Sequence, residues 1–225
     1  MDMKKIIACA ALVMGVVIFN GRLNAAVESD IVGYTTITTV PGFNMLGCVF
    51  NGLDGNALPL NQIVSGDFQD NDAIQVYDAT TGYTSYTYWK DYGGWLDGDF
   101  NPATTLIQPG TAFWLNTPGR SITVTLKGAV RSGSYTYVAK KGLQMVSSAL
   151  PVDMDLNNIT WTGLTDGDEI QVRENGAYIS YSYWKDYGGW LDGNFVPVTK
   201  PIEKGTSAWL KVAADGATFT IPEIN

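Results

Sequence analysis

A segment of aromatic and acidic residues occurs twice in this chain, and this repetition constrains its fold more than any other feature. Ser85–Phe100 recurs as Ser180–Phe195, and the copies differ only where Thr87 and Asp99 are replaced by Ser182 and Asn194. The rest of the two halves has diverged, although short blocks still match in the same order. A chain of this kind is predicted to fold as two similar lobes, and the retained segment is the first candidate for a specific function.

The matching blocks define two repeats, over residues 32–128 and 132–221. Pro109–Leu115, for example, corresponds to Lys204–Leu210. Repeats of this length are typical of domain-sized lobes rather than of solenoid units. Because the junction between them is short, we expect the lobes to pack together.

Most segments have the composition of β-strands. Residues 34–40, 73–77, 83–89, 112–116 and 121–126 are rich in β-branched and aromatic residues and are bounded by turn residues. A short helix is expected only around residues 58–64 and, in the second copy, around residues 157–161. The sequence therefore predicts an all-β protein of two similar lobes, sandwich-like or small-barrel-like.

Residues 1–26 have the pattern of a secretory signal peptide. Lys4 and Lys5 precede an apolar run that ends near Phe19, and Ala25 and Ala26 offer a cleavage site. The run is too short to favour a membrane span. We expect an exported protein, secreted, periplasmic or on the cell surface, with no membrane insertion after the signal is removed.

The net charge excludes one class of partner. The chain carries 22 acidic and 14 basic residues, for a formal charge of −8. Such a chain repels phosphate backbones, so no nucleic-acid partner is expected.

Histidine is absent from the sequence. Its absence removes serine–histidine and cysteine–histidine catalysis, as well as the usual zinc sites. Any catalysis must use carboxylates, tyrosines, lysines or a cation held by oxygen ligands. Cys48, the one cysteine beyond the signal segment, lies in an apolar stretch and is expected to be a buried core residue.

The repeated segment supports a binding hypothesis. Exposed aromatic rings can stack on sugars while neighbouring aspartates accept hydroxyl hydrogen bonds, which would give a glycan-binding or cell-surface interaction protein with two sites. In the alternative interpretation, the rings are core anchors and the aspartates cap turns. The candidate substrate-binding residues are Tyr86, Tyr88, Trp89, Tyr92, Trp95, Tyr181, Tyr183, Trp184, Tyr187 and Trp190.

A catalytic hypothesis uses the same segment. If a pseudo-two-fold axis brought the repeated loops together, Asp91 and Asp186 could share a proton and activate water, as in an aspartic peptidase. Asp97 and Asp192 are the fallback pair. A glycosidase would also use two carboxylates and is not separated from a peptidase by the sequence.

The pattern formed by Trp95, Pro102, Pro109, Gly110, Phe113, Trp114 and Leu115 resembles a repeat domain of secreted proteins from Akkermansia and related Verrucomicrobia. The chain is also similar to a mucin-degrading, aspartic-peptidase-like member of that group. The resemblance implies a secreted hydrolase directed at mucin or another glycoprotein. It departs from ordinary aspartic peptidases because Tyr92 and Tyr187 stand where that family has threonine or serine.

No cofactor is expected, although calcium is a weaker hypothesis. Acidic turns occur at residues 70–72, 97–99 and 166–169. None of them has the spacing of a complete calcium-binding loop, so turn chemistry explains them better.

Overall fold

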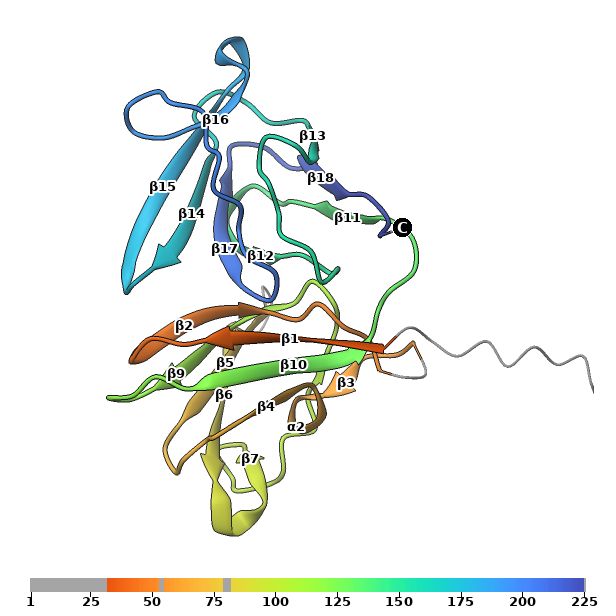
Figure 1. Ribbon diagram of the computed structural model, residues 1–225, viewed down its shortest axis with the longest axis vertical. Coiled ribbons are helices and arrows are strands. Elements are labelled where there is room, and N and C mark those ends of the chain that lie inside the picture. The colour runs from red at the N-terminus through yellow and green to blue at the C-terminus, as the bar shows by residue number, and fades with distance from the viewer. Residues whose placement is uncertain (1–31, 53–54, 79–81, 225) are drawn as a thin grey trace, which may run out of the picture. The chain divides into compact units, whose positions relative to one another are not determined.

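The first repeat consists almost entirely of antiparallel strands (Figure 1). The computed structural model describes residues 32–52, 55–78 and 82–224, so the predicted signal peptide lies outside the described residues. The elements of the first repeat are β1 (Val32–Thr38), β2 (Gly42–Gly47), β3 (Leu58–Pro59), α2 (Leu60–Ile63), β4 (Val64–Gly66), β5 (Ala73–Asp78), β6 (Gly82–Trp89), the 3-10 helix η1 (Lys90–Tyr92), β7 (Gly94–Leu96), β8 (Leu106–Ile107), β9 (Ala112–Thr117) and β10 (Thr123–Ala129).

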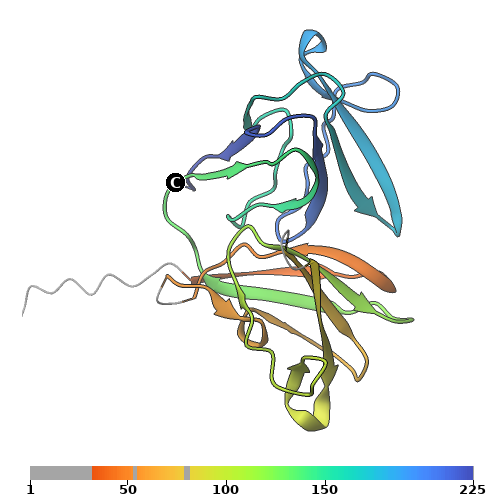
Figure 2. The same cartoon turned by 180° about the vertical axis from the view of Figure 1, so that it is seen from behind.

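These strands form two main sheets. A five-stranded sheet has the order β2-β9-β5-β6-β7, and a three-stranded sheet has the order β1-β10-β4. Figure 2 shows β10 beside β1 from behind. A two-stranded pair, β3 with β8, completes the repeat.

The second repeat has the same plan. Its elements are β11 (Tyr135–Val138), β12 (Gly142–Ser147), β13 (Thr160–Thr162), β14 (Glu169–Glu174), β15 (Ala177–Trp184), the 3-10 helix η2 (Lys185–Tyr187), β16 (Gly189–Leu191), β17 (Ser207–Val212) and β18 (Thr218–Ile221). The sheet orders, β12-β17-β14-β15-β16 and β11-β18-β13, reproduce those of the first repeat strand for strand. The predicted all-β fold of two similar, small-barrel-like lobes is confirmed.

The expected helices are only partly present. The first appears as one turn, α2, but its counterpart is absent, because the region around residues 155–161 forms turns that lead into β13. No helix in the described part of the chain is long and apolar enough to cross a membrane.

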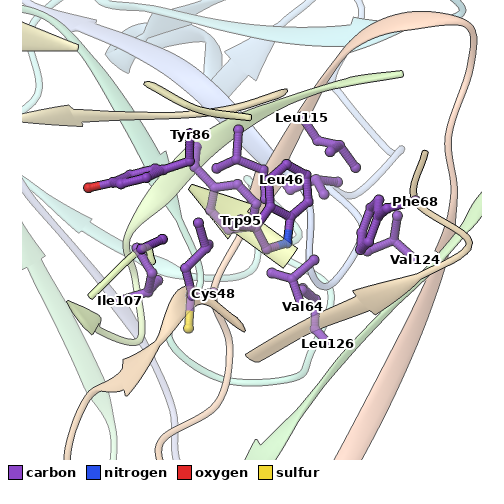
Figure 3. Packing of buried hydrophobic residues seen from close by; sticks show 14 of the residues in the cluster. Leu46, Cys48, Val64, Phe68, Tyr86, Trp95, Ile107, Leu115, Val124 and Leu126 are labelled. Atoms are coloured by element: carbon purple, nitrogen blue, oxygen red, sulfur yellow. The ribbon is translucent and has the colours of Figure 1, made fainter. Parts of the chain in front are cut away.

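Each repeat encloses its own hydrophobic core between its two main sheets. In the first repeat, Leu46 and Leu115 of the five-stranded sheet pack against Val124 and Leu126 of the three-stranded sheet. Trp95 lies among these side chains and is 2% exposed (Figure 3). The second repeat buries Trp190 in the same way. Burial of a ring this large contributes several kcal/mol, roughly 3–5 by the cost of removing one.

Cys48 lies in the first core and is fully buried. Burial raises the pKa of its thiol to about 12, although a backbone hydrogen bond with Phe50 acts in the opposite direction. The thiol is therefore protonated at neutral pH, in agreement with the expected core role.

The two repeats meet through equivalent residues. Met45 and Trp114 of the first repeat form one cluster with Met145 and Trp209, their counterparts in the second. The two indole rings are 6.4 Å apart. Contact between the same patch on both partners is the property of a two-fold interface rather than of a translational one.

Two glycine positions show the same relation. A Cβ on Gly110 would contact Tyr135 of the second repeat. A Cβ on Gly205, the counterpart of Gly110, would contact Thr35, the counterpart of Tyr135. The repeats are thus related by a pseudo-two-fold axis that passes between β2, β9, β12 and β17.

Candidate functional site

The repeated segment forms an exposed tip at one edge of each five-stranded sheet. In the first repeat, β6 ends at Trp89, η1 reverses the chain, and β7 returns beside β6. Gly93 and Gly94 make this reversal with φ values of 89° and 131°, which other residues rarely adopt. A Cβ on Gly94 would also lie 3.0 Å from the side-chain oxygen of Asn61.

Polar side chains from neighbouring loops hold the backbone of this tip. The amide of Lys90 donates to the Asp70 carboxylate at 2.8 Å, and the amide of Trp95 donates to Asn61 at 3.2 Å. In the second repeat the amides of Lys185 and Trp190 donate to Asp166 and Asn157, at 2.7 and 2.8 Å. Equivalent hydrogen bonds therefore fix the backbone of the tip in both repeats.

A tight loop after β7 is organised by Asp97. Its Oδ1 accepts hydrogen bonds from the backbone amides of Asp99 and Asn101, each at 2.9 Å. The bond from the Asn101 amide, supported by the one from Asp99, holds the pKa of Asp97 below its usual value despite some desolvation. In the second repeat, Oδ1 of Asp192 accepts from the amides of Asn194 and Val196.

This loop places a phenylalanine in a strained conformation. Phe100 has a φ of 63°, and its counterpart Phe195 has a φ of 61°. Bulky residues avoid the left-handed region, which costs them about 1–2 kcal/mol. Such strain is retained where the surroundings impose it, and it concentrates at functional sites.

The strained residue is the middle ring of an aromatic cluster. The ring centroid of Phe100 lies 6.1 Å from that of Trp89 and 6.2 Å from that of Tyr92. Tyr92 is 68% exposed and Phe100 is 60% exposed, while Trp89 is half-buried. Three rings therefore form one solvent-facing surface, which we call tip 1.

The second repeat builds the same surface, tip 2. The centroid of Phe195 lies 5.9 Å from the rings of Trp184 and Tyr187. Tyr187 and Phe195 are 66% and 58% exposed. Exposed carboxylates, Asp91 in tip 1 and Asp186 in tip 2, lie on the same short helices as the tyrosines.

The structure divides the predicted binding residues into two groups. Trp89, Tyr92, Trp184 and Tyr187 belong to the tips. The others do not: Tyr86, Trp95, Tyr181 and Trp190 are buried in the cores, and Tyr88 and Tyr183 pack edge-on against the buried tryptophans. These six residues therefore lie in the cores or pack against them.

Phe100 and Phe195 were missed by the sequence reasoning. They end the repeated segment, and their importance depends on a positive φ, which the presence of a phenylalanine does not predict. The available signal was their identity in both copies, two residues after the Asp-Gly pairs.

The structure does not bring Asp91 and Asp186 together. The pseudo-two-fold axis passes between strands β2, β9, β12 and β17, whereas η1 and η2 lie beside β7 and β16, at the other edge of each sheet. Four strand spacings, about 19 Å, separate β2 from β7. A carboxylate pair sharing one proton requires contact, so the proposed dyad is not formed.

The fallback pair has a structural role instead. Asp97 and Asp192 each close their own loop through backbone amides, as described above. The acidic turns also act as caps, since buried Asp72 accepts from the amide of Gln69 and from Arg120, and buried Asp168 accepts from the amides of Thr165 and Ala213. Within the described residues, no group of three or more candidate metal ligands comes together.

No protein-family model, curated protein or solved structure matches the chain. Its function must therefore be argued from its own geometry.

Proposed function

We propose that this chain is a non-catalytic glycan-binding protein with two aromatic tips. The observation that carries the proposal is the exposed, strained Phe100 ring between Trp89 and Tyr92, repeated around Phe195. Burial would explain a retained core ring, but it does not explain why solvent-facing rings are the same in both copies.

The chemistry of the tips favours sugars over an apolar protein partner. Each tip offers ring faces for the C–H surface of a sugar, and the aspartate on its short helix can accept hydroxyl hydrogen bonds. The rings are held before any ligand arrives, because the loop hydrogen bonds and the glycine turn fix the backbone. Preorganisation of this kind reduces the entropy lost on binding.

Two tips on one chain favour a multivalent target. If each tip binds weakly, simultaneous engagement of two sites on one glycoprotein raises the overall affinity by effective concentration. A mucin-type glycoprotein fits this requirement, and the sequence resemblance described above gives the same target. The secretory pattern of residues 1–26 would bring the chain to such a substrate.

The test is retention of purified protein on immobilised mucin. Tyr92→Ala combined with Tyr187→Ala should reduce retention more than tenfold, since both tips lose a stacking face, while each single variant should keep weaker, one-site binding. Tyr34→Ala is the matched control, because Tyr34 is 75% exposed but lies on β1, outside the tips.

Two results would refute the proposal. One is unchanged retention in the double variant at an unchanged melting temperature. The other is equal loss in the Tyr34→Ala control, which would indicate general surface adhesion rather than recognition by the tips.

A further inference from the structure

A cavity of about 240 Å³ lies between the repeats, away from both tips. It is lined by β1 and β2 of the first repeat and by the β14–β15 turn and residues 200–207 of the second. Binding pockets for drug-sized molecules run to roughly 300–1,000 Å³, so this one has room for about one small ring.

One buried hydroxyl in the cavity wall has no partner. Ser207 is 3% exposed and lines the cavity, and within the described part of the chain its Oγ makes no hydrogen bond. The indole nitrogen of Trp190 is also buried without a partner, but it belongs to the core of the second repeat. A buried hydroxyl without a partner destabilises the fold, so an occupant that bonds to it would be favoured.

The remaining lining combines an apolar floor with a charged rim. Buried Leu46, Val172 and Ile202 supply apolar surface. At the rim, Lys200 contacts Glu174 at 2.6 Å, and this hydrogen bond raises the pKa of Lys200.

The rim carries no net charge. Arg173 and Lys200 are balanced by Glu174 and Glu203. The arginine is also held in place, since its Nε donates to the carbonyl of Phe43 at 3.1 Å. A neutral rim with both donors and acceptors suits an uncharged ligand that has several hydroxyl groups better than it suits an anion or a cation.

The residues that line the cavity differ from their counterparts on the other side of the pseudo-two-fold axis. At the equivalent positions the other side has Ala112 for Ser207, Thr105 for Lys200, Tyr77 for Arg173, Gln108 for Glu203 and Tyr137 for Ile37. The hydroxyl and three of the four rim charges therefore have no equivalent on the other side, whereas Glu174 corresponds to Asp78, which is also acidic.

We propose that this cavity is a binding site for one neutral, hydroxyl-rich ring, such as a single monosaccharide unit. The apolar floor receives the ring, the Ser207 hydroxyl bonds to its buried end, and the rim charges bond to its outer hydroxyls. This site is independent of the tips and does not require that they bind glycans.

The test is calorimetric titration of the protein with galactose, fucose and N-acetylglucosamine, with glucuronic acid as a charged comparator. In the Tyr92→Ala, Tyr187→Ala background, which removes the tip tyrosines, at least one neutral sugar should bind at one site per chain, more tightly than the acid. Ser207→Ala should weaken that binding about tenfold, which corresponds to the loss of one buried hydrogen bond. Because alanine occupies the counterpart position, this variant should keep the fold, and a urea midpoint checks that it does.

Ala112→Ser is the matched control, since it places a hydroxyl at the equivalent position outside the cavity, and it should leave binding unchanged. Binding at the cavity should persist when the tip tyrosines are absent, which separates this proposal from that of the tips. Failure of every neutral sugar to bind would overturn the proposal, as would equal affinity in a folded Ser207→Ala variant or preference for the acid.

Discussion

Because the backbone at Phe100 is strained, we predict that a glycine variant is more stable than an alanine variant at this position, the reverse of the usual order. Most non-glycine positions favour alanine over glycine by about 0.5–1 kcal/mol, because glycine loses more chain entropy on folding. At a φ of 63° the order should invert, since the left-handed region costs alanine about 1–2 kcal/mol and glycine almost nothing. Phe100→Gly should therefore be more stable than Phe100→Ala by about 1 kcal/mol.

Both variants lack the ring, so its lost contacts cancel in the comparison. In a folded unit of this size, 1 kcal/mol corresponds to about 2–4 °C in melting temperature. Thermal unfolding followed by circular dichroism measures the difference, and the same pair at Phe195 repeats it. The control pair is Tyr92→Gly and Tyr92→Ala in η1, where φ is not positive and alanine should be at least as stable as glycine. If the Phe100→Ala variant is as stable as the Phe100→Gly variant, or more stable, the backbone at this position is not strained and the argument for a preorganised tip fails.

Three further predictions concern other parts of the molecule. Asp97→Asn should destabilise the chain at neutral pH, because the folded-state pKa of Asp97 is lowered. Its stabilisation exists above the unfolded pKa, about 3.9, and is lost as pH falls through the folded value. The difference in urea midpoint from the wild type should close in acid, and a difference that grows there would contradict this. Gly47→Ala should cost about 2 kcal/mol, because its Cβ would lie 2.3 Å from the side chain of Ser147 and 2.7 Å from the Thr206 carbonyl. Gly98→Ala, with open space around it, should be nearly neutral by the same measurement. Cys48, with a pKa raised to about 12, should react with a thiol reagent at pH 8 only after denaturation, and rapid labelling of the native chain would refute its burial.

The fold was predictable because its signals are local and occur twice. Strand 83–89 was expected from its aromatic and β-branched residues, and the structure has β6 at Gly82–Trp89. The turn at Gly93 and Gly94 was expected from their permissive backbone. The prediction of a second helix was wrong because residues 157–161 have only a short apolar spacing, which the packing of β13 against β18 overrides.

The site was predictable only in part, because sequence alternation does not say which aromatic ring faces the core. Tyr86 and Tyr92 look alike in the segment, yet one is 4% exposed and the other 68%. The separation of Asp91 from Asp186 depends on where the pseudo-two-fold axis passes, and this is decided by Met45, Trp114 and their counterparts rather than by the repeated segment. The inter-repeat cavity depends on long-range packing and had no signal in the sequence.

Observation of the tryptophan indole N–H signals by nuclear magnetic resonance, during titration with neutral oligosaccharides released from mucin, tests the central claim most directly. The signals of Trp89 and Trp184 can be assigned by replacing each with phenylalanine. Sugar stacking on the tips predicts that both signals shift in a saturable way, while those of buried Trp95 and Trp190 stay in place. Binding of the oligosaccharides with no change at Trp89 and Trp184 would contradict the account.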